Sequence, residues 1–151
     1  MRRRVRMRGL TLIELLIAMV IVAVLATIAI PSYRSHIVRT QRTDAISALL
    51  NVQAAQEKYF LQHNRYTNQL TAPPPAGLGL RDTSENGYYT LEIEVPAGSA
   101  EPDAYRVIAR PRAGTGPADD ERCQLFSIDQ NGRRYARDAQ GNDRTTECWR
   151  R

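Results

Sequence analysis

The sequence predicts an α+β protein in which one long N-terminal helix is followed by an antiparallel sheet of about four strands. Three features of the 151-residue chain lead to this prediction. An unbroken apolar run near the N-terminus continues into a segment with the apolar spacing of an amphipathic helix. The C-terminal half alternates apolar and polar residues, as half-buried strands do. An Asn-Gly pair, which is a strong hairpin signal, separates the last two alternating segments.

The apolar run spans residues 10–30 and has the sequence LTLIELLIAMVIVAVLATIAI, with three polar residues, Thr11, Glu14 and Thr27. A helix of this length extends about 31 Å, which is enough to cross the hydrocarbon core of a membrane. Five arginines and no acidic residue precede it. This charge predicts that the N-terminus stays cytoplasmic and that the chain after Pro31 is exported.

The leading arginines also account for the charge of the whole chain. The formal net charge is +5 and the isoelectric point is ≈ 9.6, values that would otherwise suggest a nucleic-acid or membrane partner. Without those five arginines, the chain has 21 − 5 = 16 basic residues and 16 acidic residues, so it is formally neutral. The net charge therefore indicates targeting and carries almost no information about a ligand.

Glu14 distinguishes the apolar run from an ordinary targeting segment. A secretory signal peptide also begins with positive charge, and Thr27-Ile28-Ala29 weakly resembles its cleavage site. A plain single-pass anchor is a second alternative. In either case a lone carboxylate inside the run costs about 2.5 to 3.5 kcal/mol on insertion scales. Glu14 therefore requires a partner or a protonated state.

Pro31 removes one backbone donor and crowds the preceding turn, so it should kink the helix or end it. Beyond it, an apolar stripe recurs every three to four residues and consists of Ala45, Ala48, Leu49, Val52, Ala55 and Tyr59. We expect this helix to run to about His63 and its stripe to dock on the sheet. Residues 64–86 contain Pro73-Pro74-Pro75, Gly77 and Gly79, with Gly87 just beyond, and these residues predict a long loop.

Three later segments have the period of two that is expected of strands. Their alternating residues are Tyr89, Leu91, Ile93 and Val95 in the first, Tyr105, Val107 and Ala109 in the second, and Cys123, Leu125 and Ser127 in the third. Arg133 to Arg137 is a weaker fourth segment, which the turn at 129–132 joins to the third. Residues 96–103 and 110–122 are predicted to be longer connections.

The only two cysteines, Cys123 and Cys148, lie 25 positions apart and lack the C-x-x-C spacing of zinc or thioredoxin-like sites. In an exported chain we expect them to form a disulfide. Closing a loop of about 26 residues would stabilise the fold by roughly 3.5 kcal/mol. Two buried thiols are the alternative.

No catalytic constellation is visible, so we expect a protein that is not an enzyme and holds no cofactor and no metal. The two histidines, His36 and His63, have no motif partner, and a polar helix face is their expected role. Asp119-Asp120-Glu121 and Asp129-x-Asn131-Gly132 are similar to fragments of calcium sites. A solvated loop and a hairpin turn explain these two segments better.

Residues Arg8-Gly9-Leu10-Thr11-Leu12-Ile13-Glu14-Leu15 resemble the type III signal of type IV prepilins and pseudopilins. The resemblance rests on a short basic leader, a glycine junction, a glutamate five residues into the mature chain and an unbroken apolar helix. It implies that a prepilin peptidase cleaves between Gly9 and Leu10 and methylates the nitrogen of Leu10, where the family usually has phenylalanine. It also implies that Glu14 pairs with the amine of Leu10 on a neighbouring subunit and so sets the axial register of a fibre.

Over residues 34–151 the resemblance rests on the element order, the cysteine pair and the Cys148-Trp149 ending, which look like the minor pilins of the PilE group. It implies the pilin fold, with a helix kinked near Pro31 and the cysteine pair enclosing an outward-facing region. The implied organisation is a cleaved cytoplasmic leader, 1–9, a transmembrane and fibre-core helix, 10–30, and an exported helix with a globular domain, 31–151.

The implied function is that of a structural subunit, a minor pilin of a type IV pilus that supports pilus assembly, adhesion, twitching motility or DNA uptake. The implied partners are other pilin subunits, the prepilin peptidase and the inner-membrane assembly machinery. The chain would lie in the inner membrane, with its domain periplasmic, before it joins the extracellular fibre. A type II secretion pseudopilin and a membrane-held receptor for DNA or a host surface are alternatives. Arg133, Arg134 and Arg137 could contact DNA phosphates or form a solvated strand edge.

Overall fold

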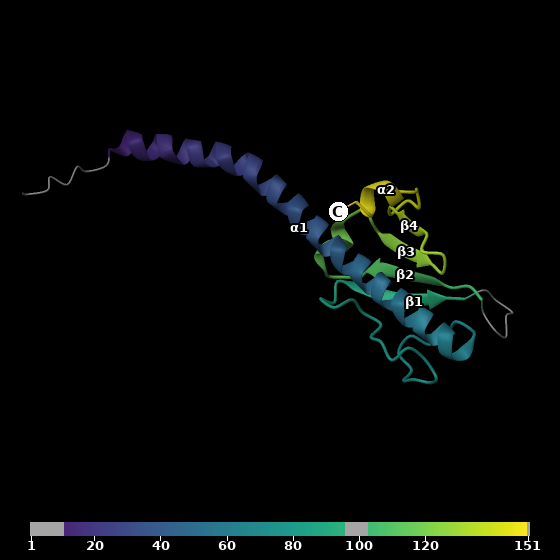
Figure 1. The fold of residues 1–151 in the computed structure, drawn as a ribbon. Coiled ribbons are helices and arrows are strands. Elements are labelled where there is room, and N and C mark those ends of the chain that lie inside the picture. The colour runs from purple at the N-terminus through teal and green to yellow at the C-terminus, as the bar shows by residue number, and fades with distance from the viewer. Residues whose placement is uncertain (1–10, 96–102, 151) are drawn as a thin grey trace, which may run out of the picture. The chain divides into compact units, whose positions relative to one another are not determined.

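The computed structural model describes residues 11–95 and 103–150, so the predicted cleavage site at Gly9 and Leu10 lies outside the described residues. The elements in chain order are α1 (Leu12–His63), β1 (Tyr89–Glu94), β2 (Arg106–Pro111), the 3-10 helix η1 (Gly116–Asp119), β3 (Leu125–Asp129), β4 (Arg134–Arg137) and α2 (Thr145–Cys148) (Figure 1). The chain divides into two compact units, Met1–Ile37 and Val38–Arg151, and α1 contributes to both.

The first unit contains the apolar half of α1. Its segment Leu12–Ile30 is long and apolar enough to cross a membrane, and none of it is buried. Thr11 caps the helix, because its Oγ1 accepts a hydrogen bond from the backbone N–H of Glu14 at 3.3 Å. The helix continues through Pro31, so of the two expected effects of this proline, a kink or an end, it does not have the second. The predicted kink at Pro31 stays a prediction, and the predicted end at His63 is confirmed.

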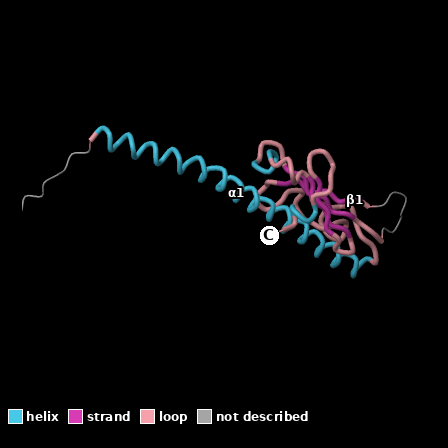
Figure 2. The backbone as a smooth tube through the Cα atoms, turned by 90° about the horizontal axis from the view of Figure 1, so that it is seen from above, coloured by secondary structure: helices cyan, strands magenta, loops and turns pink. Residues whose placement is uncertain are grey.

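In the second unit, α1 packs on an antiparallel sheet with the strand order β1-β2-β3-β4. Figure 2 shows the strands gathered beside the C-terminal half of the helix. The buried face of α1 includes Ala45, Leu49 and Val52 and follows the predicted stripe. It meets inward-facing residues of all four strands, namely Leu91, Ile93, Val107, Ala109, Phe126, Ile128 and Ala136. The four predicted strands are confirmed, with bounds shifted by one or two residues.

The third strand corrects one prediction. Within β3 the core-facing residues are Phe126 and Ile128, whereas the predicted alternating set is Cys123, Leu125 and Ser127. Of that set Cys123 is in the core, but it lies before the strand. The reason is that β3 is central and covered on both faces, so Ser127 is only 2% exposed although it points away from the helix. A strand buried on both sides loses the alternation from which its inner face could be predicted.

The loop after α1 is attached to the helix by a buried glutamine. Gln56 is fully buried, and its Nε2 donates to the carbonyl of Thr67 at 2.6 Å. The backbone N–H of Thr67 donates to Gln56 Oε1 at 3.2 Å. One side chain therefore satisfies both backbone groups of Thr67, where water could not reach them. This long loop of 64–88 is thereby held against the end of the helix.

Candidate functional site

The candidate assembly site is the N-terminal part of α1. Leu12, Ile13, Leu15 and the apolar residues that follow are largely exposed, for example Leu12 at 85%. Glu14 is also exposed, and among the described residues its carboxylate makes no hydrogen bond or ion pair. The arrangement is a continuous apolar surface with one carboxylate available to a partner. Such a surface is unfavourable in water and needs lipid or other protein to cover it.

Thr11 and Glu14 also have a local role. Their spacing is that of a capping box, in which a threonine caps the helix and a glutamate three residues later can reach back to it. Among the described residues only the bond from the Glu14 backbone N–H to Thr11 is made, so the Glu14 carboxylate stays available to a partner. Glutamine can serve the capping role equally well, which makes the two roles separable by substitution.

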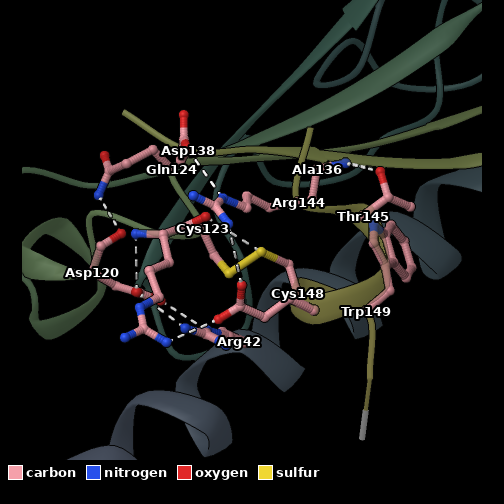
Figure 3. The surroundings of a disulfide bond; sticks show 12 residues. Arg42, Asp120, Cys123, Gln124, Ala136, Asp138, Arg144, Thr145, Cys148 and Trp149 are labelled. Atoms are coloured by element: carbon pink, nitrogen blue, oxygen red, sulfur yellow. Dashed lines mark hydrogen bonds and ion pairs between the residues drawn. A yellow bond between two sulfur atoms is a disulfide. The ribbon is translucent and has the colours of Figure 1, made fainter. Parts of the chain in front are cut away.

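The C-terminal region is held to the rest of its unit by a disulfide and a buried ion pair (Figure 3). Cys123 and Cys148 are bonded, and the bond ties the segment before β3 to α2. Nearby, Arg42 of α1 makes a two-pronged contact with Asp120, at 2.7 and 3.0 Å. Their side chains are only 13% and 6% exposed. The disulfide and the ion pair thus join three parts of the chain that are distant in sequence.

Asp138 organises the loop between β4 and α2. Its carboxylate accepts hydrogen bonds from the side chain and backbone of Asn142, from Arg144 and from the backbone of Gln140. These donors, led by the Asn142 side chain, lower the pKa of Asp138 to about 2. Asp138 is therefore ionised at neutral pH, with its oxygens already used by the protein.

The two segments that are similar to calcium-site fragments have protein partners as well. Asp129 Oδ1 accepts from the backbone N–H groups of Asn131 and Arg133, and Oδ2 accepts from the Tyr135 hydroxyl at 3.2 Å. These contacts build the turn between β3 and β4. Asp120 binds Arg42 as described. Neither carboxylate is left open toward a cation.

The second candidate site is the outer sheet face, the face of the sheet turned away from α1. Ile108, Ser127 and Tyr135 pair across β2, β3 and β4 at its centre, and Arg106 pairs with Asp129 beside them. Ile108 and Ser127 are almost fully buried, while Arg106 is exposed. The guanidinium of Arg106 lies over the Tyr135 ring, 5.1 Å from its centroid. The long polar side chains thus cover a small apolar floor.

The structure separates the three arginines that were grouped as a candidate DNA contact. Arg137 belongs to the outer sheet face, and Arg133 borders it at the turn. Arg134 lies on the opposite side of β4, with its guanidinium 5.2 Å from the centre of the Trp149 ring. Strand alternation causes this separation, because neighbouring residues of a strand point to opposite faces.

Two residues of this face were missed from the sequence, Arg106 and Arg110. Both line the outer sheet face together with Tyr135 and Arg137. The signal that could have found them is the alternation of β2, in which they flank the inward residues Val107 and Ala109. The same alternation puts acidic residues on this face, because Arg106 stands in register between Glu94 of β1 and Asp129 of β3.

Comparison with known proteins shows which protein family the chain matches. Residues 31–127 match the family described as "Type IV minor pilin ComP, DNA uptake sequence receptor", and residues 4–30 match the prokaryotic N-terminal methylation motif. A type IV major pilin protein, PilE1 of Neisseria gonorrhoeae, is 34% identical over 91 residues, which are 60% of this chain and 53% of that protein. The chain thus spans about half the length of the first curated relatives that it matches.

A second kind of relative is the type II secretion system core protein G of Klebsiella pneumoniae, 28% identical over 143 residues, which are 91% of this chain and 94% of that protein. Among solved structures, the non-core minor pilin PilV of Neisseria meningitidis aligns with a TM-score of 0.51 and 18% identity, covering 72% of this chain and 94% of that one. This likeness confirms the pilin fold. The family match covers more than half of the sequence, and the chain therefore belongs to the type IV minor pilin family.

Proposed function

We propose that this chain is a subunit of a type IV pilus, in which the N-terminal half of α1 forms part of the fibre core. The observation that carries the proposal is the exposed apolar surface of residues 12–30 with the single carboxylate of Glu14, in a segment that matches the methylation motif. A prepilin peptidase cleaves after Gly9 and methylates Leu10. The inner membrane covers the apolar helix before assembly, and other pilin subunits cover it afterwards.

The physical reason for assembly is the exchange of one apolar environment for another. Residues 12–30 move from lipid to the helices of neighbouring subunits without contact with water, so little hydrophobic free energy is gained or lost. Specificity must therefore come from polar contacts. Glu14 pairs with the free amine of Leu10 on a neighbouring subunit, and both charges are expensive in an apolar core unless they are paired. Only the correct axial register satisfies them.

The mature N-terminus tests this proposal. We expect N-terminal sequencing and intact mass to find a chain that begins at N-methylated Leu10. A chain that begins after Ala29 would instead be an ordinary secreted protein, and the proposal would be wrong. A chain that retains the leader in a strain with an active prepilin peptidase would contradict it equally.

DNA binding is a second proposed activity of the same subunit. The match to a family described as a DNA uptake sequence receptor favours it, and so do the exposed arginines of the outer sheet face. The alternative of a pseudopilin in a type II secretion apparatus is favoured by the similarity to core protein G. Deleting the gene separates these roles, because loss of DNA uptake with intact protein secretion supports the pilus.

A further inference from the structure

Buried polar atoms without a hydrogen-bond partner gather at one place in the globular unit. Among the described residues, three such oxygens, Gln41 Oε1, Asp44 Oδ2 and the Tyr89 hydroxyl, come from one neighbourhood, which we call the junction site. A further one, the Tyr105 hydroxyl, belongs to a ring that packs on Tyr66 elsewhere in the core. Buried polar groups are almost always bonded to protein or to ordered water, so three unpartnered oxygens at one place require a shared partner.

Asp44 is tied to the turn from which β1 begins. Asp44 is only 7% exposed, and its Oδ1 accepts hydrogen bonds from the backbone N–H and the Nδ2 of Asn86, at 3.2 and 3.0 Å. The backbone N–H of Ser84 donates to the carbonyl of Tyr89 at 2.9 Å, and the N–H of Tyr89 donates to Ser84 Oγ at 3.0 Å. These two bonds close the turn that contains Asn86. Asp44 is therefore fixed to a turn that ends at Tyr89.

The Tyr89 hydroxyl lies among the charges of this neighbourhood. Tyr89 is fully buried, and this burial raises the pKa of its hydroxyl, which the carboxylates of Asp120 and Asp44 raise further. The hydroxyl therefore keeps its proton and needs an acceptor for it. Both oxygens of Asp120 already accept from Arg42, whereas Asp44 Oδ2 accepts from no described residue. No direct hydrogen bond joins Tyr89 to Asp44, so a small molecule between them could serve both.

Gln41 completes the junction site from the preceding turn of α1. Residues three apart in a helix are neighbours, with Cβ atoms about 5 to 6 Å apart, so Gln41 lies beside Asp44. The amide of Gln41 also contacts η1, because a Cβ added to Gly116 would stand 2.8 Å from its nitrogen and its oxygen. The junction site thus lies where α1, η1 and the start of β1 meet.

We propose that the junction site binds one water molecule, held by the Tyr89 hydroxyl, Asp44 Oδ2 and Gln41 Oε1. The Tyr89 hydroxyl donates to the water oxygen, and the two water hydrogens are donated to Asp44 and to Gln41. Three hydrogen bonds are the usual number for a buried water, and here they satisfy one protein donor and two protein acceptors.

A metal cation suits these three atoms less well than water does. A cation accepts no hydrogen bond, so the proton of the Tyr89 hydroxyl would still have no acceptor. The guanidinium of Arg42, whose charge acts on the Tyr89 hydroxyl, would also repel a cation at this place. Ca²⁺ requires about six to eight oxygen ligands, more than the three that the junction site offers.

The proposed water links segments that are distant in sequence. It connects α1 to the first residue of β1, and through Gln41 it stabilises the surface of α1 that contacts η1. This role concerns the globular unit and does not depend on the pilus function proposed above.

Nuclear magnetic resonance of the full mature chain in detergent tests for this water directly. We expect cross-relaxation from a long-lived water to the ring protons of Tyr89 and to the side-chain methylene protons of both Asp44 and Gln41. Cross-relaxation that fails to reach any one of these three residues would overturn the proposal.

Single variants test whether the three atoms depend on the water. Tyr89→Phe keeps the ring and removes the donor, so its melting temperature should fall by about 5 °C. Tyr105→Phe is the matched control, because that hydroxyl has no other unpartnered group beside it, and it should change the melting temperature by about 1 °C or less. Gly116→Ala should displace the Gln41 amide and lower the melting temperature as Gln41→Leu does. Equal losses in Tyr89→Phe and Tyr105→Phe would contradict the proposed site.

A double variant shows whether Gln41 and Tyr89 share one ligand. Gln41→Leu with Tyr89→Phe should cost less than the sum of the two single losses, because the first change already weakens the water that the second would lose. Additive losses would mean that the two groups act independently, against a shared water. A higher melting temperature in sodium or calcium chloride than in choline chloride, at equal ionic strength, would assign the site to a cation and overturn the proposal.

Discussion

At the scale of single residues, three buried carboxylates of the globular unit, Asp120, Asp129 and Asp138, serve the protein itself. Asp120 binds Arg42, Asp129 builds a turn, and Asp138 gathers four donors around the loop before α2. Such an arrangement satisfies charges that would be costly if buried alone. It also explains why acidic segments that are similar to calcium sites in the sequence have structural roles.

Asp138 gives the unit a pH dependence whose direction can be stated. Its pKa is about 2 in the folded chain and near 3.9 when unfolded, so the folded state binds fewer protons. Its contribution to stability is therefore complete above about pH 4 and is lost as the pH falls from about 4 toward 2. We expect the melting temperature to drop in this range in the wild type. Asp138→Asn should melt lower at pH 6 and approach the wild type at pH 2.5, and a constant difference between the two would contradict this assignment.

Gln56 shows how one polar residue inside an apolar stripe can hold a loop. Gln56→Leu keeps the size of the side chain but leaves the Thr67 N–H and carbonyl groups buried without partners. Each unsatisfied group costs about 1 to 3 kcal/mol. We expect a lower melting temperature and faster amide hydrogen exchange over residues 64–70. Gln62→Leu, at an exposed position of the same helix, is the control and should alter neither measurement.

At the scale of elements, the sequence was sufficient to predict a helix or strand wherever one periodicity extended over several residues. The end of α1 and the first three strands follow from spacing, and the Asn-Gly turn supports the weaker fourth strand. The inner face of β3 could not be predicted, because both of its faces are buried. The helices η1 and α2 have four residues each, too few to show a period. The contact between Arg42 and Asp120 spans 78 positions and depends on the tertiary fold.

That contact is the main polar link between α1 and the C-terminal region. Removing one partner leaves the other charge buried, which typically costs about 3 to 5 kcal/mol. We expect Arg42→Gln or Asp120→Asn to destabilise the unit by several kcal/mol, and the double variant to cost less than the sum. The exposed pair Arg122 and Glu147, with side chains 73% and 38% exposed, is the control and should contribute about 1 kcal/mol or less. Additive losses at Arg42 and Asp120 would argue against a coupled pair.

At the scale of the whole molecule, the charged and apolar parts are separated along the chain. The residues after the leader carry 16 basic and 16 acidic side chains, so any anion-binding surface depends on where arginines gather and not on net charge. The candidate assembly helix could be recognised from the sequence because its signal is local. The outer sheet face could not, because its arginines come from strands that meet only in the fold.

Glu14 belongs to this largest scale, because its proposed partner is another subunit. Glu14→Gln keeps the capping spacing with Thr11 and removes the charge, whereas Glu14→Ala removes both. If the charge pairs with the amine of Leu10, the prepilin peptidase should still process both variants normally. Their recovery in sheared fibres should fall to about a tenth of the wild-type amount or less, because an unpaired amine in an apolar core is costly. Immunoblots of fibre and membrane fractions measure this, with Glu85→Gln, an exposed acidic residue of the globular unit, as the control. Wild-type recovery of Glu14→Gln would mean that fibre incorporation does not need the Glu14 charge.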